Sequence, residues 1–450
     1  MTCASQWKSL RFGPDFYLGL LILCNHLPPG LSKDPHPLLL ILAEGLSEMY
    51  LGEGSREKLT GLREMAMHGV LARGLMPVFP TLFYPNYYSL FTGRYSESHH
   101  VTGNYMWDEV TGKEFRFGQD EQSKLPMWWE GAEPLWVSME LQGQRVRMYH
   151  WPGCDVAVFK VQPSFCQPYS GRSSVLTQEA IADALQHFQQ GSAAMAAVYY
   201  EDVALAGRHH GPGSEARRAA LANLDAIVRN TTDTIRSLRL DVNLVLVSDH
   251  GLMDIDFDDK VIELENYIPA HFIKKQMDKG ATVNLWTNDG REDEVYQLLK
   301  DLSNMTVYRR NEVPERFHYG AGRFVSPLTL LADEGWFITW NRAALPYWEN
   351  GGDSSLAPNR GWDGYDNSVL SMQAVLLAWG PDFKQSYIAP PLHTVDVYPL
   401  LCNLTGVSPL PHNGSWEKVH LLLSSSFDIR TSTCTSWLIF WAMAIWMCMT

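Results

Sequence analysis

The stretch that decides the fold is VNLVLVSDHG, residues 242–251. Its first part is a continuous apolar run, which is typical of a strand buried on both faces of a parallel sheet. Directly after that run come a carboxylate, Asp249, and an imidazole, His250. Ligands of open parallel sheets bind outside the carboxyl ends of the strands, and a carboxylate beside an imidazole suits a zinc ion. Taken alone, the same pair also fits an ordinary turn at the end of a strand.

Three further runs share this continuous apolar character: residues 38–43 (LLLILA), 193–200 (AAMAAVYY) and 374–379 (AVLLAW). Helical stretches lie between them. The clearest is residues 214–238, where Leu221, Leu224 and Val228 recur at three- and four-residue spacing. Strands that alternate with helices predict an α/β fold, with a central, largely parallel sheet and helices on both faces. No internal repeat of about 20–50 residues is present, so we expect one domain over residues 38–420.

The composition excludes some classes of protein. The chain has 450 residues, and 36 Lys+Arg against 50 Asp+Glu give a formal net charge of −14, which argues against a nucleic-acid partner. Hydrophobic residues make up 46% and aromatic residues 12%, which a disordered chain would not carry. The protein is therefore globular, with a large core.

The start of the chain resembles a secretory signal peptide over residues 1–30. Lys8 and Arg11 precede the apolar run 16–24 (FYLGLLILC), and helix-breaking residues at 28–30 follow it. A buried N-terminal helix is the alternative interpretation of this run.

The far end resembles a GPI-attachment signal over residues 424–450. Ser424, Ser425 and Ser426 are followed by a polar spacer and by the uncharged apolar run 437–449 (WLIFWAMAIWMCM). This tail is shorter than the roughly twenty residues that a membrane-spanning helix needs. We therefore expect an extracellular protein, held at the cell surface on the outer leaflet of the plasma membrane by a GPI anchor.

The sequons and cysteines also fit a protein that passes through the secretory pathway. N-glycosylation sequons begin at Asn230, Asn304, Asn403 and Asn413. Cys154 and Cys166 enclose eleven residues, which suits a local disulfide in an oxidising compartment. Cys402 is left over: it either pairs between chains, as in a homodimer, or is buried and inert.

Several motifs together resemble the ectonucleotide pyrophosphatase/phosphodiesterase family. They are residues 83–88 (FYPNYY), Thr92-Gly93, Gly103-Asn104-Tyr105, residues 248–251 (SDHG) and residues 360–367 (RGWDGYDN). Within the family, the likeness is greatest to choline-specific glycerophosphodiester phosphodiesterases, and it runs from about residue 38 to 416. The resemblance implies an alkaline-phosphatase-like fold, two zinc ions, a Ser/Thr nucleophile and a GPI anchor. It also implies choline-phosphate esters such as glycerophosphocholine or lysophospholipids as substrates.

The catalytic positions that the resemblance implies are only partly kept. The family's nucleophile precedes the aromatic-Pro-Asn triplet, and this position is Phe83, which has no hydroxyl to ionise. Thr81 is a candidate substitute two residues earlier. Asn104 matches the asparagine that contacts the phosphate in the family.

The two zinc positions that the resemblance implies are kept to different degrees. At one of them, the ligands are replaced by Ala204, Arg208 and Asp363, and a guanidinium cannot ligate a cation. The other keeps Asp249 and His250, with Glu44 in place of an aspartate, so one zinc ion or none is expected. If Arg208 and Asp363 occupy the space of the lost zinc, they are expected to form an ion pair.

These observations lead to three hypotheses. The first is a catalytically impaired relative, a pseudoenzyme, that keeps a choline-headgroup pocket in which Tyr199 contacts the trimethylammonium group; ordinary core packing is the other reading of Tyr199. The second is an active zinc phosphodiesterase that uses Thr81 or a metal-bound hydroxide. The third is a cell-surface glycoprotein that binds no ligand.

Overall fold

A computed structural model describes residues 35–52, 59–116, 120–169, 174–349 and 356–424. The predicted signal peptide and, apart from Ser424, the predicted GPI-attachment signal lie outside the described residues. In the described part, no helix has the length and apolar character needed to cross a membrane. The described residues belong to one compact unit with the bounds Pro35–Ser425.

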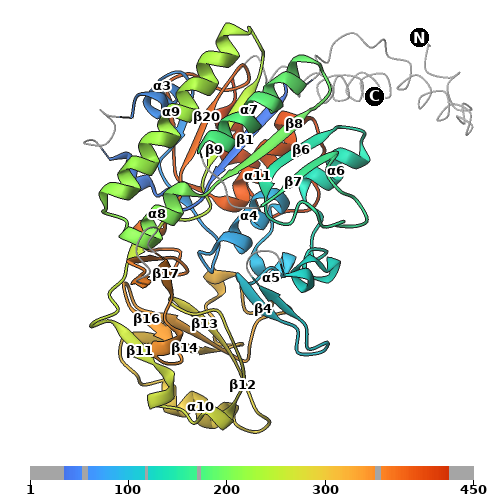
Figure 1. Cartoon of the computed structure of the whole chain (residues 1–450). Coiled ribbons are helices and arrows are strands. Elements are labelled where there is room, and N and C mark those ends of the chain that lie inside the picture. Colours follow the sequence, from blue (N-terminus) through green and yellow to red (C-terminus); the bar gives the residue numbers. More distant parts are fainter. Residues whose placement is uncertain (1–34, 53–58, 117–119, 170–173, 350–355, 425–450) are drawn as a thin grey trace, which may run out of the picture. The chain divides into compact units, whose positions relative to one another are not determined.

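The core of this unit is an eight-stranded sheet in the order β21-β2-β20-β9-β1-β8-β6-β7 (Figure 1). Its strands are β1 (Leu38–Ala43), β2 (Val70–Ala72), β6 (Val146–Trp151), β7 (Phe165–Pro168), β8 (Met195–Tyr200), β9 (Asn243–Val247), β20 (Leu376–Trp379) and β21 (Tyr387–Ala389). The four predicted runs form β1, β8, β9 and β20, which confirms them as strands. β20 is antiparallel to both of its neighbours, and the other pairs are parallel, so the sheet is largely parallel as predicted.

Helices cover both faces of this sheet. One face carries α3 (Thr60–Met67), α7 (Ser174–Gln189) and α9 (Glu215–Ser237), whose apolar residues pack with Ile41, Val198 and Leu246 in one core cluster. On the other side lie α4 (Phe83–Thr92), α6 (Leu135–Leu141) and α11 (Thr394–Thr405), which contact one another (Figure 1). Helix α9 confirms the helix predicted over residues 214–238. Ser214 caps it by accepting a hydrogen bond from the backbone N–H of Arg217 at 3.1 Å.

A second, four-stranded antiparallel sheet in the order β12-β13-β15-β14 has its own apolar core. It consists of β12 (Ile273–Met277), β13 (Thr282–Thr287), β14 (Met305–Arg309) and β15 (Leu328–Ala332), with α10 (Glu292–Leu299) against it. Sequence patterns had not predicted this sheet, because its strands are short and two of them are only partly buried.

Short elements complete the unit. The remaining helices are α5 (Ser96–His99), α8 (Asp202–His210) and α12 (Trp416–Val419). Five two-stranded pairs are β3 (Leu75–Met76) with β22 (Leu392–His393), β4 (Tyr105–Trp107) with β5 (Glu114–Arg116), β10 (Met253–Asp254) with β19 (Gly361–Trp362), β11 (Val261–Glu263) with β16 (Phe337–Thr339), and β17 (Tyr347–Glu349) with β18 (Leu356–Pro358). Single 3-10 turns lie at Glu48–Leu51, Glu121–Lys124, Pro126–Trp128, Leu264–Asn266, Ala270–Phe272, Glu315–Phe317, Arg342–Ala344, Leu370–Met372 and His420–Leu422.

Candidate functional site

Three parallel strands bring acidic side chains to one edge of the main sheet. Glu44 directly follows β1, Glu201 directly follows β8, and Asp249 lies two residues after β9. Because β1 lies between β8 and β9 in parallel register, the three strands end at the same edge. This is the edge at which open parallel sheets bind ligands.

Helix α8 adds a cation to this edge. The Arg208 Nη2 group donates to Glu44 Oε1 at 2.6 Å and to Asp363 Oδ2 at 3.1 Å, and Arg208 Nε donates to Asp363 Oδ1 at 3.3 Å. This bidentate contact confirms the ion pair predicted between Arg208 and Asp363. The contact with Glu44 had not been predicted. Glu44 also accepts a hydrogen bond from the hydroxyl of Tyr199, so both of its carboxylate oxygens have partners.

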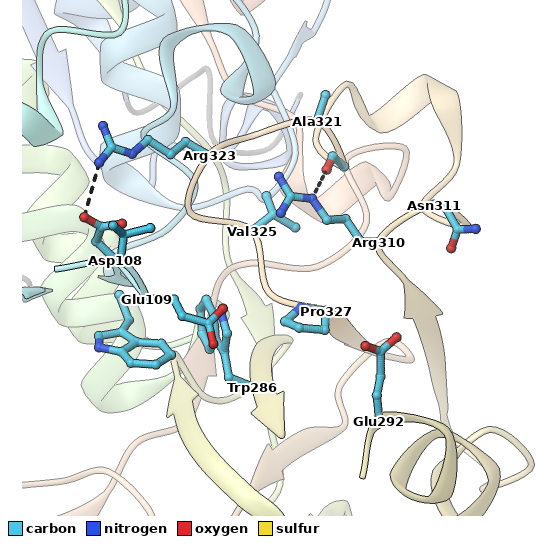
Figure 2. Close-up of a pocket in the computed structure, with 13 residues that line it drawn as sticks. Asp108, Glu109, Trp286, Glu292, Arg310, Asn311, Ala321, Arg323, Val325 and Pro327 are labelled. Carbon is cyan, nitrogen blue, oxygen red and sulfur yellow. Dashed lines mark hydrogen bonds and ion pairs between the residues drawn. The ribbon is translucent and has the colours of Figure 1, made fainter. Parts of the chain in front are cut away.

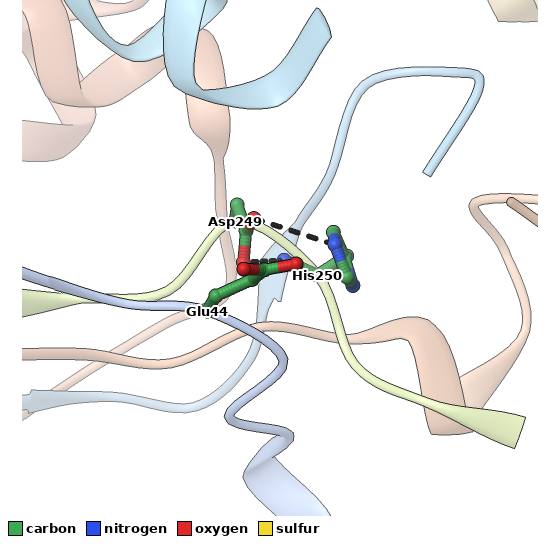
Figure 3. A group of neighbouring side chains, drawn as sticks. All are labelled: Glu44, Asp249 and His250. Carbon is green, nitrogen blue, oxygen red and sulfur yellow. Dashed lines mark hydrogen bonds and ion pairs between the residues drawn. The ribbon is translucent and has the colours of Figure 1, made fainter. Parts of the chain in front are cut away.

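Asp249 and His250 complete what we call the ion cluster: Glu44, Arg208, Asp249, His250 and Asp363. His250 Nε2 lies 3.3 Å from Asp249 Oδ2 and 3.3 Å from Asp363 Oδ2. Asp249 Oδ1 accepts backbone hydrogen bonds from Gly45 at 3.1 Å and from His250 at 2.9 Å, which fixes the carboxylate at the strand end. Figure 3 shows Glu44, Asp249 and His250 side by side.

Burial and charge act against each other on these groups. Burial raises the pKa of Asp249 to about 6, although the neighbouring His250 lowers it in part. For His250, burial acts to lower the pKa, but Asp249 and Asp363 outweigh it and the pKa is raised. For Arg208, burial also acts to lower the pKa, but Asp363 and Glu44 hold it well above the ordinary value. The guanidinium therefore stays charged at any physiological pH.

Glu44, Asp249 and His250 could hold one metal ion, since one ligand atom from each lies within 4.8 Å of the others. Asp249 Oδ2 and His250 Nε2 are buried and have no hydrogen-bond partner among the described residues. In the neutral ring, His250 Nδ1 donates to the carbonyl oxygen of Gly251 at 2.8 Å, which leaves the lone pair on Nε2. These two atoms are therefore suited to bind a cation.

The family of this chain is shown by its similarity to known proteins. The model of the type I phosphodiesterase / nucleotide pyrophosphatase family matches residues 38–366.

This chain belongs to that family.

Members of the type I phosphodiesterase family match most of the chain. The human ectonucleotide pyrophosphatase/phosphodiesterase family member 5 is 30% identical over 403 residues, which are 88% of this chain and 80% of the relative. A mouse bis(5'-adenosyl)-triphosphatase is 32% identical over 401 residues, which are 87% of this chain and 82% of the relative. These names are nucleotide names, so the likeness to choline-specific members stays a prediction.

Solved structures of the type I phosphodiesterase family confirm the predicted alkaline-phosphatase-like α/β fold. Murine ectonucleotide pyrophosphatase/phosphodiesterase 5 matches with a TM-score of 0.77 at 29% identity, over 86% of this chain and 100% of that chain. An inactive form of the same murine protein in complex with AMP gives the same values. The human protein matches with a TM-score of 0.78 at 29% identity, over 87% of this chain and 100% of that chain.

The residues at the second zinc position that the resemblance predicts do not suit a metal ion. Ala204 is buried in α8 and offers no donor atom, and Arg208 places a permanent cation where the ion would lie. Asp363 remains as a carboxylate, but both of its oxygens accept from Arg208. Among the described residues, the one group of side chains that could hold a metal ion is therefore Glu44, Asp249 and His250.

The position that the resemblance predicts for the nucleophile carries an aromatic ring. Phe83 is the first residue of α4 and is fully buried, and its ring centroid lies 5.0 Å from that of Tyr199 and 5.1 Å from that of Tyr84. Thr81, the candidate substitute, is also fully buried. Its hydroxyl donates to the carbonyl oxygen of Tyr365 at 2.8 Å and accepts from the N–H of Gly364 at 3.1 Å. Both roles of the Thr81 hydroxyl are thus taken by backbone groups, and its use as a nucleophile stays a prediction.

The side chain of Asn104 lies beside the N-terminus of α4. Its Oδ1 accepts from the backbone N–H of Tyr84, the second residue of α4, at 3.1 Å. The side chain is thereby fixed beside the helix N-terminus, where backbone N–H groups favour an anion. A phosphate contact of Asn104 remains a prediction.

Tyr199 packs inside the protein. Its side chain is fully buried, and its ring lies against those of Phe83 and Tyr169, at 5.0 Å and 6.0 Å between centroids. A ring in this position orients Glu44 through its hydroxyl. Its contact with a choline headgroup stays a prediction.

Sequence analysis missed Glu201. Its carboxylate accepts from the Tyr169 hydroxyl at 2.9 Å and from the Tyr199 hydroxyl at 3.5 Å, so it lies next to the ion cluster. The signal was present in the sequence, because Glu201 directly follows an apolar run just as Glu44 does.

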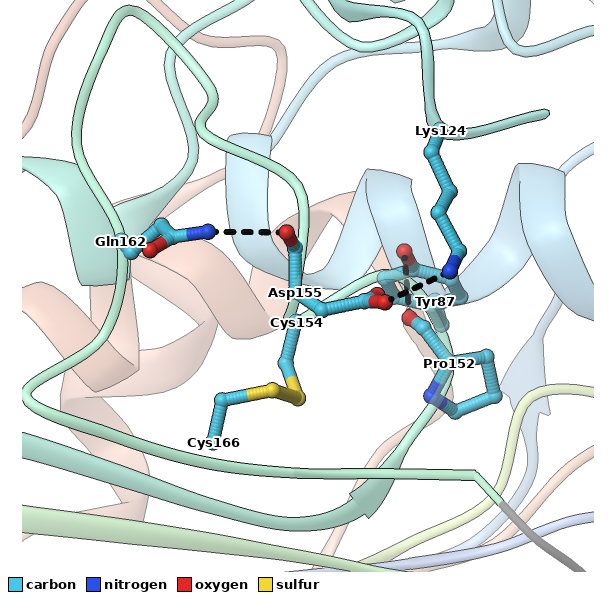
Figure 4. Close-up of a disulfide and its surroundings, with 7 residues drawn as sticks. All are labelled: Tyr87, Lys124, Pro152, Cys154, Asp155, Gln162 and Cys166. Carbon is cyan, nitrogen blue, oxygen red and sulfur yellow. Dashed lines mark hydrogen bonds and ion pairs between the residues drawn. A yellow bond between two sulfur atoms is a disulfide. The ribbon is translucent and has the colours of Figure 1, made fainter. Parts of the chain in front are cut away.

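The predicted disulfide is present. Cys154 and Cys166 are bonded, with 5.6 Å between their Cα atoms. Figure 4 shows how the bridged loop is held: the Tyr87 hydroxyl of α4 donates to the carbonyl oxygen of Pro152 at 3.3 Å, and Lys124 pairs with Asp155 at 3.2 Å. The segment just before the bridge therefore contacts the helix that begins at Phe83.

Of the two alternatives for Cys402, the structure has the buried one. Cys402 is a free thiol inside α11, and burial raises its pKa to about 12. Its thiolate form is therefore scarce at neutral pH. A homodimer remains an untested prediction.

The sequons differ in accessibility. Asn230 in α9 and Asn413 are exposed, whereas Asn304 and Asn403 are half-buried. Glycosylation at all four positions stays a prediction, and so does attachment of a GPI anchor near Ser424.

A separate cavity of about 800 Å³ lies between the β4–β5 hairpin and the second sheet (Figure 2). Trp107 and Trp286 line it, with ring centroids 5.3 Å apart. Of its charged residues, Asp108 pairs with Arg323 at 3.2 Å, and Arg310 donates to the carbonyl oxygen of Gly320 at 3.0 Å. No residue of the ion cluster lines this cavity, so we assign it no part in the chemistry of that cluster.

Proposed function

We propose that this chain is a non-hydrolysing member of the type I phosphodiesterase family, a pseudoenzyme that keeps the fold and ligand edge of a hydrolase. The observation that carries the proposal is the buried ring of Phe83 at the first residue of α4. A phosphodiesterase of this type needs a hydroxyl there to form the phosphoryl-enzyme, and a phenyl ring can neither ionise nor attack phosphorus. The ion cluster adds support, because at most one of the two cations that would stabilise the transition state fits.

The proposal places the protein outside the cell. The relatives are named as ectonucleotide enzymes, and the Cys154–Cys166 disulfide suits an oxidising compartment. A GPI anchor at the outer leaflet of the plasma membrane is part of the proposal and rests on the terminal sequence pattern alone.

Hydrolysis tests the central part of this proposal. We expect the full chain, expressed on the surface of animal cells and supplied with zinc, to hydrolyse neither the nitrophenyl ester of phosphocholine nor that of AMP above the rate of a matched Phe83→Ala variant. The two rates should be equal, because Phe83 takes no part in chemistry.

Turnover by the wild-type chain would overturn the proposal. The Thr81→Ser and Thr81→Ala variants would then identify the nucleophile. Serine keeps a hydroxyl, so loss of turnover in Thr81→Ala alone would establish Thr81 as the attacking group.

We propose phosphocholine as the ligand that binds at the carboxyl edge of the main sheet. It rests on the resemblance to choline-specific members, and aromatic rings next to the carboxylate of Glu201 are the groups that bind a trimethylammonium ion. We expect phosphocholine to raise the melting temperature of the protein, with a smaller rise from AMP, since a ligand that prefers the folded state stabilises it. An equal or larger rise with AMP would favour a nucleotide ligand, and no rise with either would favour a glycoprotein that binds neither.

A further inference from the structure

Arg208 bridges two carboxylates of the ion cluster. Its guanidinium contacts two carboxylates that lie far apart in the sequence, with one contact to Glu44 and two to Asp363. The side chain of Glu44 is completely buried and that of Asp363 is 3% exposed, while Arg208 is 19% exposed. A charge that bridges two buried carboxylates acts on them as a bound cation would, by offsetting the cost of keeping both ionised.

Charge balance limits what else the ion cluster can bind. With three carboxylates ionised and both Arg208 and His250 protonated, the formal charge is −3 + 2 = −1. With one divalent ion on a neutral His250, it is −3 + 1 + 2 = 0. A second divalent ion would bring it to +2, in a site that already holds a guanidinium. One divalent ion is therefore the most that the cluster can neutralise.

The available ligand atoms agree with this limit. Both oxygens of Glu44 and both oxygens of Asp363 have hydrogen-bond partners, whereas Asp249 Oδ2 and His250 Nε2 have none among the described residues. The two atoms without a hydrogen bond lie on the Asp249 side of the cluster, 3.3 Å from each other. On the Arg208 side, every carboxylate oxygen of Glu44 and Asp363 already accepts a hydrogen bond.

We propose that the Arg208 guanidinium is the resident cation of this centre, in place of a metal ion between Glu44 and Asp363, so that the chain binds at most one divalent cation, at Asp249 and His250. The inference rests on the proposed function only in treating the ion cluster as the altered centre of a family member. It follows that removal of the guanidinium exposes a second cation site made of Glu44 and Asp363.

Zinc counts on purified full chains test this inference. Wild type, Arg208→Ala, Arg208→Gln and the control Arg229→Ala are equilibrated with zinc, freed of unbound metal and analysed for zinc per chain. Arg229 suits as the control because it is exposed and, among the described residues, its side chain hydrogen-bonds to Thr60. We expect at most one zinc ion in wild type and in Arg229→Ala, and one more than wild type in Arg208→Ala and Arg208→Gln.

Stability provides a second readout on the same samples. Zinc should raise the melting temperature of the two Arg208 variants more than that of wild type, because the added ion replaces the lost cation. Arg208→Gln removes less of the side chain than Arg208→Ala, so it remains informative if the alanine variant does not fold. Zinc counts in the Arg208 variants that equal the wild-type count, with no added stabilisation, would overturn the inference. Neither readout depends on hydrolysis, so turnover by wild type would contradict the proposed function and leave this inference standing.

Discussion

Replacing Arg208 by methionine is expected to lower the free energy of unfolding in the presence of a metal chelator by about 3–5 kcal/mol, the usual cost of removing one partner of a buried ion pair. Methionine keeps most of the side-chain length, so little of the loss comes from a cavity. The loss comes from Glu44 and Asp363, which keep their buried carboxylates without a cation. Urea denaturation at pH 7 measures it.

A control variant separates this effect from the general cost of losing an arginine. Arg229→Met removes an exposed side chain of α9 and should change the free energy of unfolding by about 0.5 kcal/mol or less. If Arg208→Met is as stable as the control in chelator, the guanidinium does not stabilise the ion cluster. The interpretation of Arg208 as the resident cation would then be wrong.

Loss of the disulfide is expected to have the next largest effect. A double Cys154→Ala, Cys166→Ala variant should lose about 2–4 kcal/mol of unfolding free energy, because the bridge restricts a short loop in the unfolded chain. The effect should extend to α4, because the Tyr87 hydroxyl donates to the carbonyl oxygen of Pro152, two residues before the bridge. Denaturation with two probes, far-UV circular dichroism and tryptophan fluorescence, measures both.

Gln162→Ala is the matched control for the disulfide. It lies in the same loop and loses one hydrogen bond, from Gln162 Nε2 to the carbonyl oxygen of Asp155 at 2.8 Å, but keeps the bridge. Its cost should be about 1 kcal/mol or less. A double cysteine variant no less stable than this control would show that the bridge contributes nothing to the fold.

The sequence predicts the ligand edge well because a strand end is a local feature. Apolar runs at β1, β8 and β9 have the composition of buried strands, and the residue that follows such a run lies at the carboxyl edge. Asp249 was found by this rule, Glu44 through the family resemblance, and Glu201 would have been found by applying the rule to every strand. The direction of β20 was not predictable, because an apolar run has the same composition whichever way it enters the sheet.

The contacts within the ion cluster depend on information that no local pattern contains. Opposite charges at Arg208 and Asp363 were enough to predict one ion pair. The contact between Arg208 and Glu44 depends on how α8 is oriented when it leaves β8, and that orientation is set by packing of the whole helix. For the same reason, the sequence alone did not show that the Thr81 hydroxyl is taken up by the backbone of residues 364 and 365.

The most direct test of the central claim, that Arg208 replaces one cation of the centre, is a crystal structure of the full chain grown with zinc, with anomalous diffraction recorded at the zinc edge. The account predicts at most one anomalous peak, next to Asp249 and His250, with the Arg208 guanidinium still between Glu44 and Asp363. Two peaks within the ion cluster, with Arg208 displaced from both carboxylates, would contradict it.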